Sequence, residues 1–71
     1  MVLVKCLIAI SVIKGGRYVP EYDWYQGKFI KQNTGGTKYQ VDFGITFKTL
    51  GIKDLEVRWV EHNNCLFVEE K

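Results

Sequence analysis

This sequence of 71 residues contains few of the residues that specific chemistry requires. It has one histidine, His62, and only two cysteines, Cys6 and Cys65, near opposite ends of the chain. A structural zinc site needs four ligands at short paired spacings, so the cysteines form no zinc motif. Its single alanine, Ala9, argues against a helical protein, because alanine is the strongest helix former. We therefore expect no metal site and no cofactor.

The chain also lacks a strong charge of either sign and a long apolar run. A formal net charge of +2 is too small to indicate nucleic-acid binding by itself. The apolar segment 2–13 is shorter than the about 20 residues that cross a bilayer, and Lys5 interrupts it. A secretory signal has its charge before the apolar run and small residues at a cleavage site. We therefore interpret this segment as a buried strand and expect a cytoplasmic protein with no membrane contact.

Strand-forming residues dominate what is present, and this length allows one core, so we expect a single domain over residues 1–71. Gly15 and Gly16 predict that the first strand, at 2–13, ends before them. Pro20 then predicts a loop over 14–23, because proline lacks the donor that a central strand needs. Alternating side chains then predict a hairpin. Its strands are expected at 24–31 and 37–43, joined by a turn rich in asparagine and glycine.

Within this hairpin, Tyr25 and Phe29 are predicted to point inward, and Gly27 between them marks a close backbone approach. The remainder is predicted from changes in periodicity. The expected elements are a short strand at 45–48, a helical turn at 50–55 capped by Thr49, a strand at 56–62, a turn at Asn63–Asn64 and a strand at 65–68. Cys6 and Cys65 thus fall on strands. Two reduced, partly buried thiols are the favoured interpretation, and a disulfide is the alternative if the strands are neighbours.

Three segments carry a resemblance: Trp24-Tyr25-Gln26-Gly27-Lys28-Phe29-Ile30, then Tyr39-Gln40-Val41-Asp42-Phe43-Gly44, then Asp54-Leu55. They resemble the Tudor branch of the SH3-like barrels, which implies a mainly β, Tudor-like barrel of five to six strands with one short helix before the last strands. Over its whole length the chain resembles the YorP family of small Bacillus and phage proteins. That resemblance implies a phage or prophage origin and no particular activity.

The first candidate site is an aromatic rim between the first loop and the hairpin, formed by Tyr18, Tyr22, Trp24 and Phe43. By the Tudor resemblance, Trp24 and Phe43 lie near the positions of an aromatic cage for methylated cations. The chain departs from that pattern, because Ile45 stands where asparagine is common and Phe43 where tyrosine is usual. The competing interpretation is that these rings simply cover the core of a small barrel.

The second candidate is a basic face formed by Arg17, Lys28, Lys31 and Lys38, beside which Tyr22 and Trp24 could stack bases. Its alternative is a solvated face partly neutralised by neighbouring acidic residues. A catalytic pair would need Cys65 or Ser11 within reach of His62, and no third group to orient it is evident.

We therefore expect a protein that is not an enzyme. The sequence favours an interaction module, monomeric on its own, that binds a host or phage protein through the aromatic rim. The alternative function is a weak nucleic-acid-binding barrel that uses the basic face.

Overall fold

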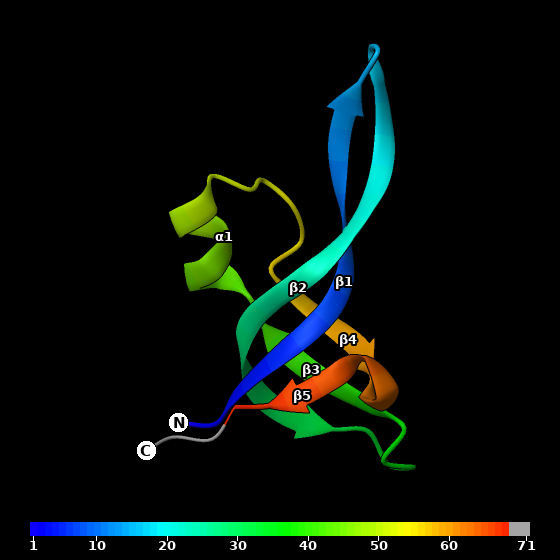
Figure 1. The fold of residues 1–71 in the computed structure, drawn as a ribbon. Helices are drawn as coiled ribbons and strands as arrows, with labels where there is room; N and C mark the ends of the chain where they lie inside the picture. Colours follow the sequence, from blue (N-terminus) through cyan, green and yellow to red (C-terminus); the bar gives the residue numbers. More distant parts are fainter. Residues whose placement is uncertain (69–71) are drawn as a thin grey trace.

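The computed structural model describes residues 1–68, which form one five-stranded antiparallel sheet and a short helix (Figure 1). The strands are β1 (Leu3–Lys14), β2 (Arg17–Gln32), β3 (Lys38–Asp42), β4 (Val57–Glu61) and β5 (Cys65–Phe67). Helix α1 (Gly44–Leu50) separates β3 from β4, and a 3₁₀ turn, η1 (His62–Asn64), precedes β5. The strand order is β4-β3-β2-β1-β5, so the last strand returns to pair with the first. The mainly β, barrel-like fold with one short helix before the last strands confirms the predicted fold class.

Strand β2 is longer than the sequence predicted. β1 confirms the predicted first strand. The loop predicted at 14–23 is wrong, because β2 begins at Arg17 and pairs with β1 from there to Lys28. Gly15 and Gly16 make a two-residue turn with φ of 58° and 76°, a conformation that glycine adopts without steric cost. The two glycines therefore reverse the chain at once and leave no room for a loop.

Pro20 lies inside β2, although proline is rare within strands. It pairs with Ser11, whose backbone N–H points away from β2 and donates to Asp54 Oδ2 at 3.0 Å. In such a pair the backbone groups of both residues turn outward. The N–H that proline lacks would therefore have faced the free edge of β2, so no ladder hydrogen bond is lost.

The buried core lies between the sheet and α1 and confirms the inward positions predicted for the hairpin. Tyr25 and Phe29 pack against it, and β2 crosses β3 closely at Gly27. The buried members are Val4, Cys6, Ile8, Val41, Phe43, Phe47, Val60 and Cys65.

Gly27→Ala is expected to lower the free energy of unfolding by about 1–3 kcal/mol, the usual cost of overpacking. A Cβ at this position would lie 2.6 Å from Val41 Cγ1 and 2.9 Å from the Asp42 carbonyl oxygen. Urea denaturation measures the change. Gly35→Ala is the control, because a Cβ there meets nothing within 4 Å. Equal stability of the two variants would contradict the close approach.

Residues 44–50 correct two predictions. The segment 45–48, which was expected to be a strand, is part of α1. The helical turn expected at 50–55 is also wrong, because the helix ends at Leu50 and residues 51–55 are not helical. Gly51 ends the helix with a left-handed φ of 70°, and its N–H bonds to the Lys48 carbonyl oxygen. Thr49 is therefore no N-cap: its hydroxyl donates to the Ile45 carbonyl oxygen inside the last turn.

Candidate functional site

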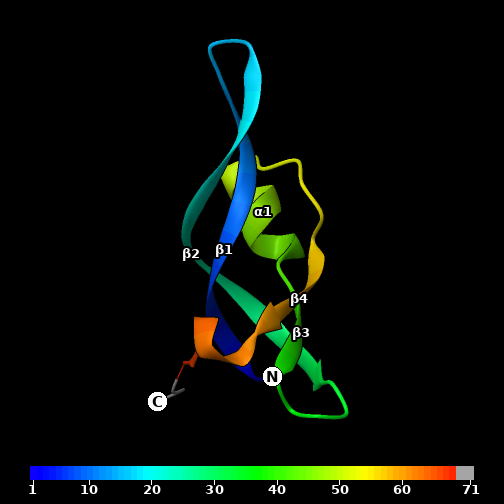
Figure 2. The same ribbon diagram turned by 90° about the vertical axis from the view of Figure 1, so that its right-hand side faces the viewer.

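The upper part of the β1–β2 hairpin projects from the body of the molecule (Figures 1 and 2). β5 pairs with β1 only at Val4–Cys6, and β3 pairs with β2 only at Lys28–Gln32. Among the described strands, residues 7–24 thus pair only with one another, and we call this segment the arm. It gives the molecule its long axis, with overall extents of 39 × 28 × 15 Å.

Side-chain alternation divides the arm into two faces of different chemistry. All four charged residues of the arm lie on the inner face, which continues into the core: these are Lys14, Arg17, Glu21 and Asp23. The outer face has no charged residue. It consists of four cross-strand pairs: Leu7–Trp24, Ala9–Tyr22, Ser11–Pro20 and Ile13–Tyr18.

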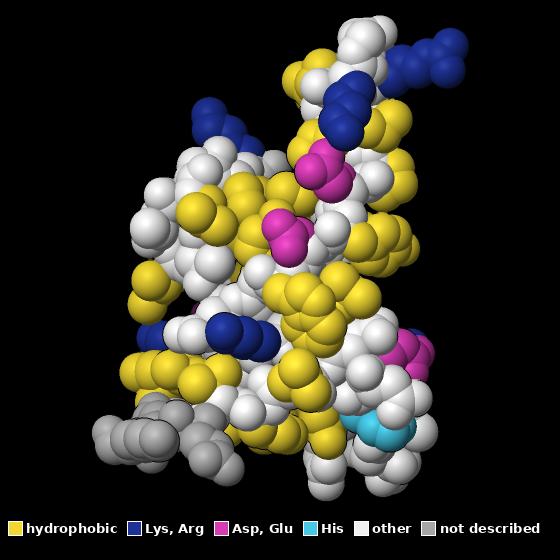
Figure 3. Space-filling model, in the orientation of Figure 1, with side chains coloured by type: hydrophobic (Ala, Val, Ile, Leu, Met, Phe, Trp, Pro, Cys, Tyr) yellow, Lys and Arg dark blue, Asp and Glu magenta, His cyan; other side chains and the backbone are white. Residues whose placement is uncertain are grey.

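The side chains of the outer face are well exposed. The exposed fraction is 76% for Tyr18, 69% for Tyr22, 67% for Ile13 and 46% for Trp24. In the space-filling view, hydrophobic side chains run along the arm and continue over the middle of the molecule, with charged side chains beside them (Figure 3). The solvated face of an antiparallel sheet normally carries polar side chains. A contiguous apolar surface that is exposed instead marks an interaction site. The outer face of the arm is therefore the candidate site.

Three of the four predicted rim residues, Tyr18, Tyr22 and Trp24, lie together on this face. The fourth prediction is wrong: Phe43 is 0% exposed and stacks on Phe47 with ring centroids 5.6 Å apart. α1 packs over Phe43 and buries it in the core. Phe43 therefore cannot contribute to the aromatic cage that the Tudor resemblance implied. Ile13 also lies on this face and was not among the predicted residues, because its position depends on the register with β2.

Both edges of the arm carry features that obstruct an added strand. On the β2 edge, Pro20 offers no donor, and the Trp24 N–H bonds to Asp23 Oδ1 at 2.7 Å. On the β1 edge, Arg58 Nη1 donates to the Ala9 carbonyl oxygen at 2.6 Å, beside the bond from Ser11 to Asp54. Edges blocked by proline and by side chains resist strand addition. The arm consequently offers a partner its face rather than its edges.

Asp54 and Arg58 hold the base of the arm against the body. Arg58 Nη2 lies 3.2 Å from Asp54 Oδ1, its Nε donates to the Leu55 carbonyl oxygen, and its guanidinium group lies over the ring of Phe47. The backbone N–H groups of Ser11 and Leu55, together with Arg58, lower the pKa of Asp54 below its ordinary value. These contacts fix the direction in which the arm leaves the sheet.

Asp54→Asn is expected to reduce the free energy of unfolding at pH 7 by about 1 kcal/mol, because hydrogen bonds to a charged group are lost. The stabilisation by the wild-type carboxylate is complete above the pKa of the unfolded chain, about 3.9. It is lost as the pH falls from there through the lower folded pKa. Thermal unfolding of both proteins at pH 7 and pH 3 should show a difference that shrinks at the lower pH. A difference independent of pH would contradict this role.

The predicted basic residues do not form one face. Arg17 lies at the tip of the arm, whereas Lys28, Lys31 and Lys38 lie on the lower sheet. Each of these lysines has a partner or a neighbour that reduces its availability. Lys28 pairs across the strands with Asp42, Lys31 Nζ lies 6.0 Å from the centre of the Trp59 ring, and Lys38 Nζ lies 3.9 Å from Glu61 Oε1. The structure therefore separates Arg17 from the three lysines, which share one face of the lower sheet, and an acidic side chain partly neutralises Lys38.

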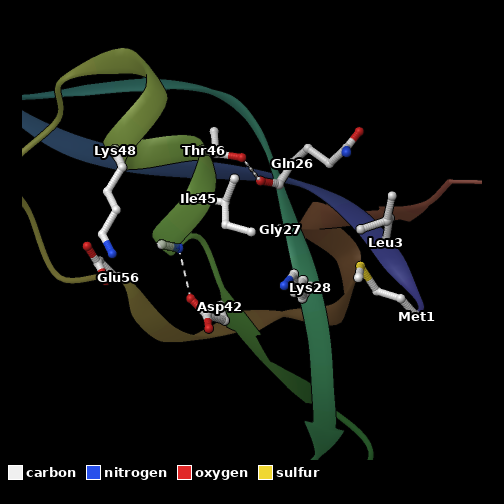
Figure 4. Close-up of a pocket in the computed structure, with 11 residues that line it drawn as sticks. Met1, Leu3, Gln26, Gly27, Lys28, Asp42, Ile45, Thr46, Lys48 and Glu56 are labelled. Carbon is white, nitrogen blue, oxygen red and sulfur yellow. Dashed lines mark hydrogen bonds between the residues drawn. The ribbon is translucent and has the colours of Figure 1, made fainter.

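A groove of about 420 Å³ lies between the start of α1 and the lower part of β2 (Figure 4). Ile45 lies at its centre, Met1 and Leu3 at one end, and Lys48 and Glu56 at the other. The hydroxyl group of Thr46, which lines the groove, donates to the Gln26 carbonyl oxygen and is therefore engaged within the protein. The backbone N–H of Cys65 bonds to the His62 carbonyl oxygen, but its thiol contacts Cys6 Sγ and the Glu61 carbonyl oxygen, so no thiol–imidazole hydrogen bond forms in the described structure.

Among residues 1–68, no cluster of three or more histidine, cysteine or acidic side chains is placed to hold a metal ion. α1, at seven residues, is far too short to cross a membrane, and no other described helix is long and apolar enough.

No protein-family model, curated protein or solved structure matches this chain. The case for a function therefore depends on the geometry and the chemistry of the arm.

Proposed function

We propose that this chain is a non-enzymatic protein-interaction module that binds its partner through the outer face of the arm. The observation that supports this is the row of four cross-strand pairs between residues 7 and 24, which carries three exposed aromatic rings and no charge. Tyrosine and tryptophan dominate the energetics of protein interfaces, because they bury a large area with few rotatable bonds. Charged residues are depleted from interface centres.

The position of the charges also supports a protein partner. The charged side chains of the arm lie on its inner face, so a partner can cover the outer face without burying a charge of the arm. The YorP-family resemblance makes a host or phage protein the expected partner.

The alternative, binding of single-stranded nucleic acid, has one favourable feature: Lys5 and Lys28 continue the outer face just below Trp24. Such binding stacks bases on aromatic rings and weakens steeply with salt. Glu61 partly neutralises Lys38, however, and Lys31 lies against the Trp59 ring, so this function is the less favoured one.

The test is capture of a partner from host lysate by immobilised protein, followed by titration of the purified partner. We expect one protein to bind the wild type with defined stoichiometry and to lose binding when the outer face of the arm is changed. In parallel, amide shifts are recorded with single-stranded DNA, RNA and duplex at low and high salt. Salt-sensitive shifts on the lysines, without a protein partner, would overturn the proposal. Self-association through the arm would replace the expected partner with a second copy.

A further inference from the structure

The two cysteines of the chain meet in the core, and the proposed function makes no use of them. Cys6 of β1 lies directly opposite Cys65 of β5, and their Sγ atoms are 3.4 Å apart. Both side chains are buried and both thiols are free. The residues are 59 positions apart in sequence, so only the return of β5 to β1 brings them together.

The backbone around this pair suits a covalent bond. The Val2 carbonyl oxygen accepts from Phe29 of β2, and the Leu3 carbonyl oxygen accepts from Val68 beyond β5. Even-numbered residues of β1 therefore direct their backbone groups to β2, which makes Cys6–Cys65 a non-hydrogen-bonded pair. The Cα atoms of such pairs are about 4.5 Å apart, within the range of about 4.4–6.8 Å found for disulfides. The two strands need not move apart or slide for the sulfurs to join.

The hydrogen bonds distinguish the two thiols. The Cys65 S–H donates to the Glu61 carbonyl oxygen at 3.4 Å, so the contact between the sulfurs is a donation from Cys6 to Cys65. Burial raises the pKa of both thiols, and the Cys6 S–H opposes that rise at Cys65. Cys65 also lies on a three-residue strand at the edge of the sheet, where opening requires the loss of few contacts. It is the thiol that a reagent in solution reaches first.

We propose that Cys6 and Cys65 form a redox pair that a small-molecule disulfide, such as oxidised glutathione, converts into a cross-strand disulfide between β1 and β5. The Cys65 thiolate attacks one sulfur of the reagent, whose S–S bond breaks and releases one glutathione thiolate. The Cys6 thiolate then attacks Cys65 Sγ in the mixed disulfide and displaces the second glutathione thiolate. The two protons of the cysteines leave with the two glutathione molecules, so the protein is oxidised by two electrons and the reagent is reduced by two.

The product ties the last described strand to the first. The bond closes most of the chain into one loop and thereby restricts the unfolded state, which stabilises the folded protein. It leaves the outer face of the arm unchanged, because Cys6 points into the core on the opposite side of β1 from Leu7. The redox pair is therefore independent of the proposed binding function, and either can fail without the other.

The test is incubation of the purified reduced protein with oxidised glutathione, followed by intact-mass and peptide analysis without reductant. We expect a monomer lighter by two hydrogen atoms, a peptide linking residues 6 and 65, and a melting temperature higher by about 10–30 °C. Cys6→Ser should stop at one bound glutathione on Cys65. Cys65→Ser should react much more slowly at Cys6, which lies deeper.

Three results would overturn the proposal. The folded protein could resist oxidation under conditions that oxidise the chain in denaturant. The link could form between two chains rather than within one. The bond could form and lower the melting temperature, which would show that the strands have to distort. Equal rates in the two serine variants would overturn the assignment of Cys65 as the first nucleophile.

Discussion

Phe47→Ala should lower the free energy of unfolding by about 3–5 kcal/mol, the usual cost of removing a buried aromatic ring. Phe47 is 0% exposed, and its ring stacks on Phe43 and meets the edge of Tyr25 with centroids 5.8 Å apart. The guanidinium carbon of Arg58 lies 5.5 Å from its centre. A chain of this length has a total stability of about 4–10 kcal/mol, from roughly 0.05–0.15 kcal/mol per residue. The variant should therefore lose about a third or more of the total stability.

Urea denaturation followed by tryptophan fluorescence measures this loss, and Leu50→Ala is the matched control on the same helix. Leu50 is 59% exposed, so its truncation should change the stability by less than about 1 kcal/mol. A Phe47→Ala protein as stable as the control would show that α1 does not complete the core. Loss of the arm's orientation should accompany unfolding, because Arg58 reaches both Phe47 and the Ala9 carbonyl oxygen.

The double substitution Tyr22→Thr and Trp24→Thr should weaken partner binding by about 100-fold or more while leaving the fold intact. Each ring is exposed in the free protein, so its removal leaves no cavity in the core. Truncation of a central aromatic residue at an interface commonly costs about 2 kcal/mol or more, and each 1.4 kcal/mol is a factor of ten. Threonine preserves the strand preference of β2. Titration calorimetry with the captured partner measures the affinity, and thermal unfolding measures the fold.

Trp59→Thr is the control for this prediction, because Trp59 is also a strand tryptophan and is also 46% exposed. It lies on β4, outside the arm, so its removal should leave the affinity unchanged. Equal weakening by both variants would place the binding surface elsewhere. A large fall in melting temperature for the double variant would show that the rings stabilise the fold rather than bind.

Local rules account for much of the fold. Alternation predicted the lower part of β2, β3 and β4, because a strand places successive side chains on opposite faces whatever its neighbours are. The apolar run of strand-forming residues predicted β1. The turn after β2 was also predictable: Asn33 Oδ1 accepts from the N–H groups of Thr37 and Lys38, as turn-forming asparagine commonly does. The helix was misplaced, although the spacing of Phe43 and Phe47 by four residues is a helical signal.

The candidate site was only partly predictable. Three aromatic residues of the outer face were recognised, but as the rim of a loop and together with Phe43. The sequence could not show that Gly15 and Gly16 continue the hairpin directly, since paired glycines suit both a tight turn and a loop. It could not separate Arg17 from the lower lysines, because their distance depends on how far β2 extends.

The sequence by itself determined β1, β3, β4, β5 and the lower part of β2, the inward positions of Tyr25 and Phe29, and the close approach at Gly27, because these follow from side chains a few positions apart. The tertiary structure alone decided what is exposed. β3 and β5 stop pairing before the arm begins, which leaves its outer face uncovered. α1 folds over Phe43 and buries it, and β5 returns to place Cys65 against Cys6. Each of these outcomes depends on contacts between distant segments, which no local pattern records.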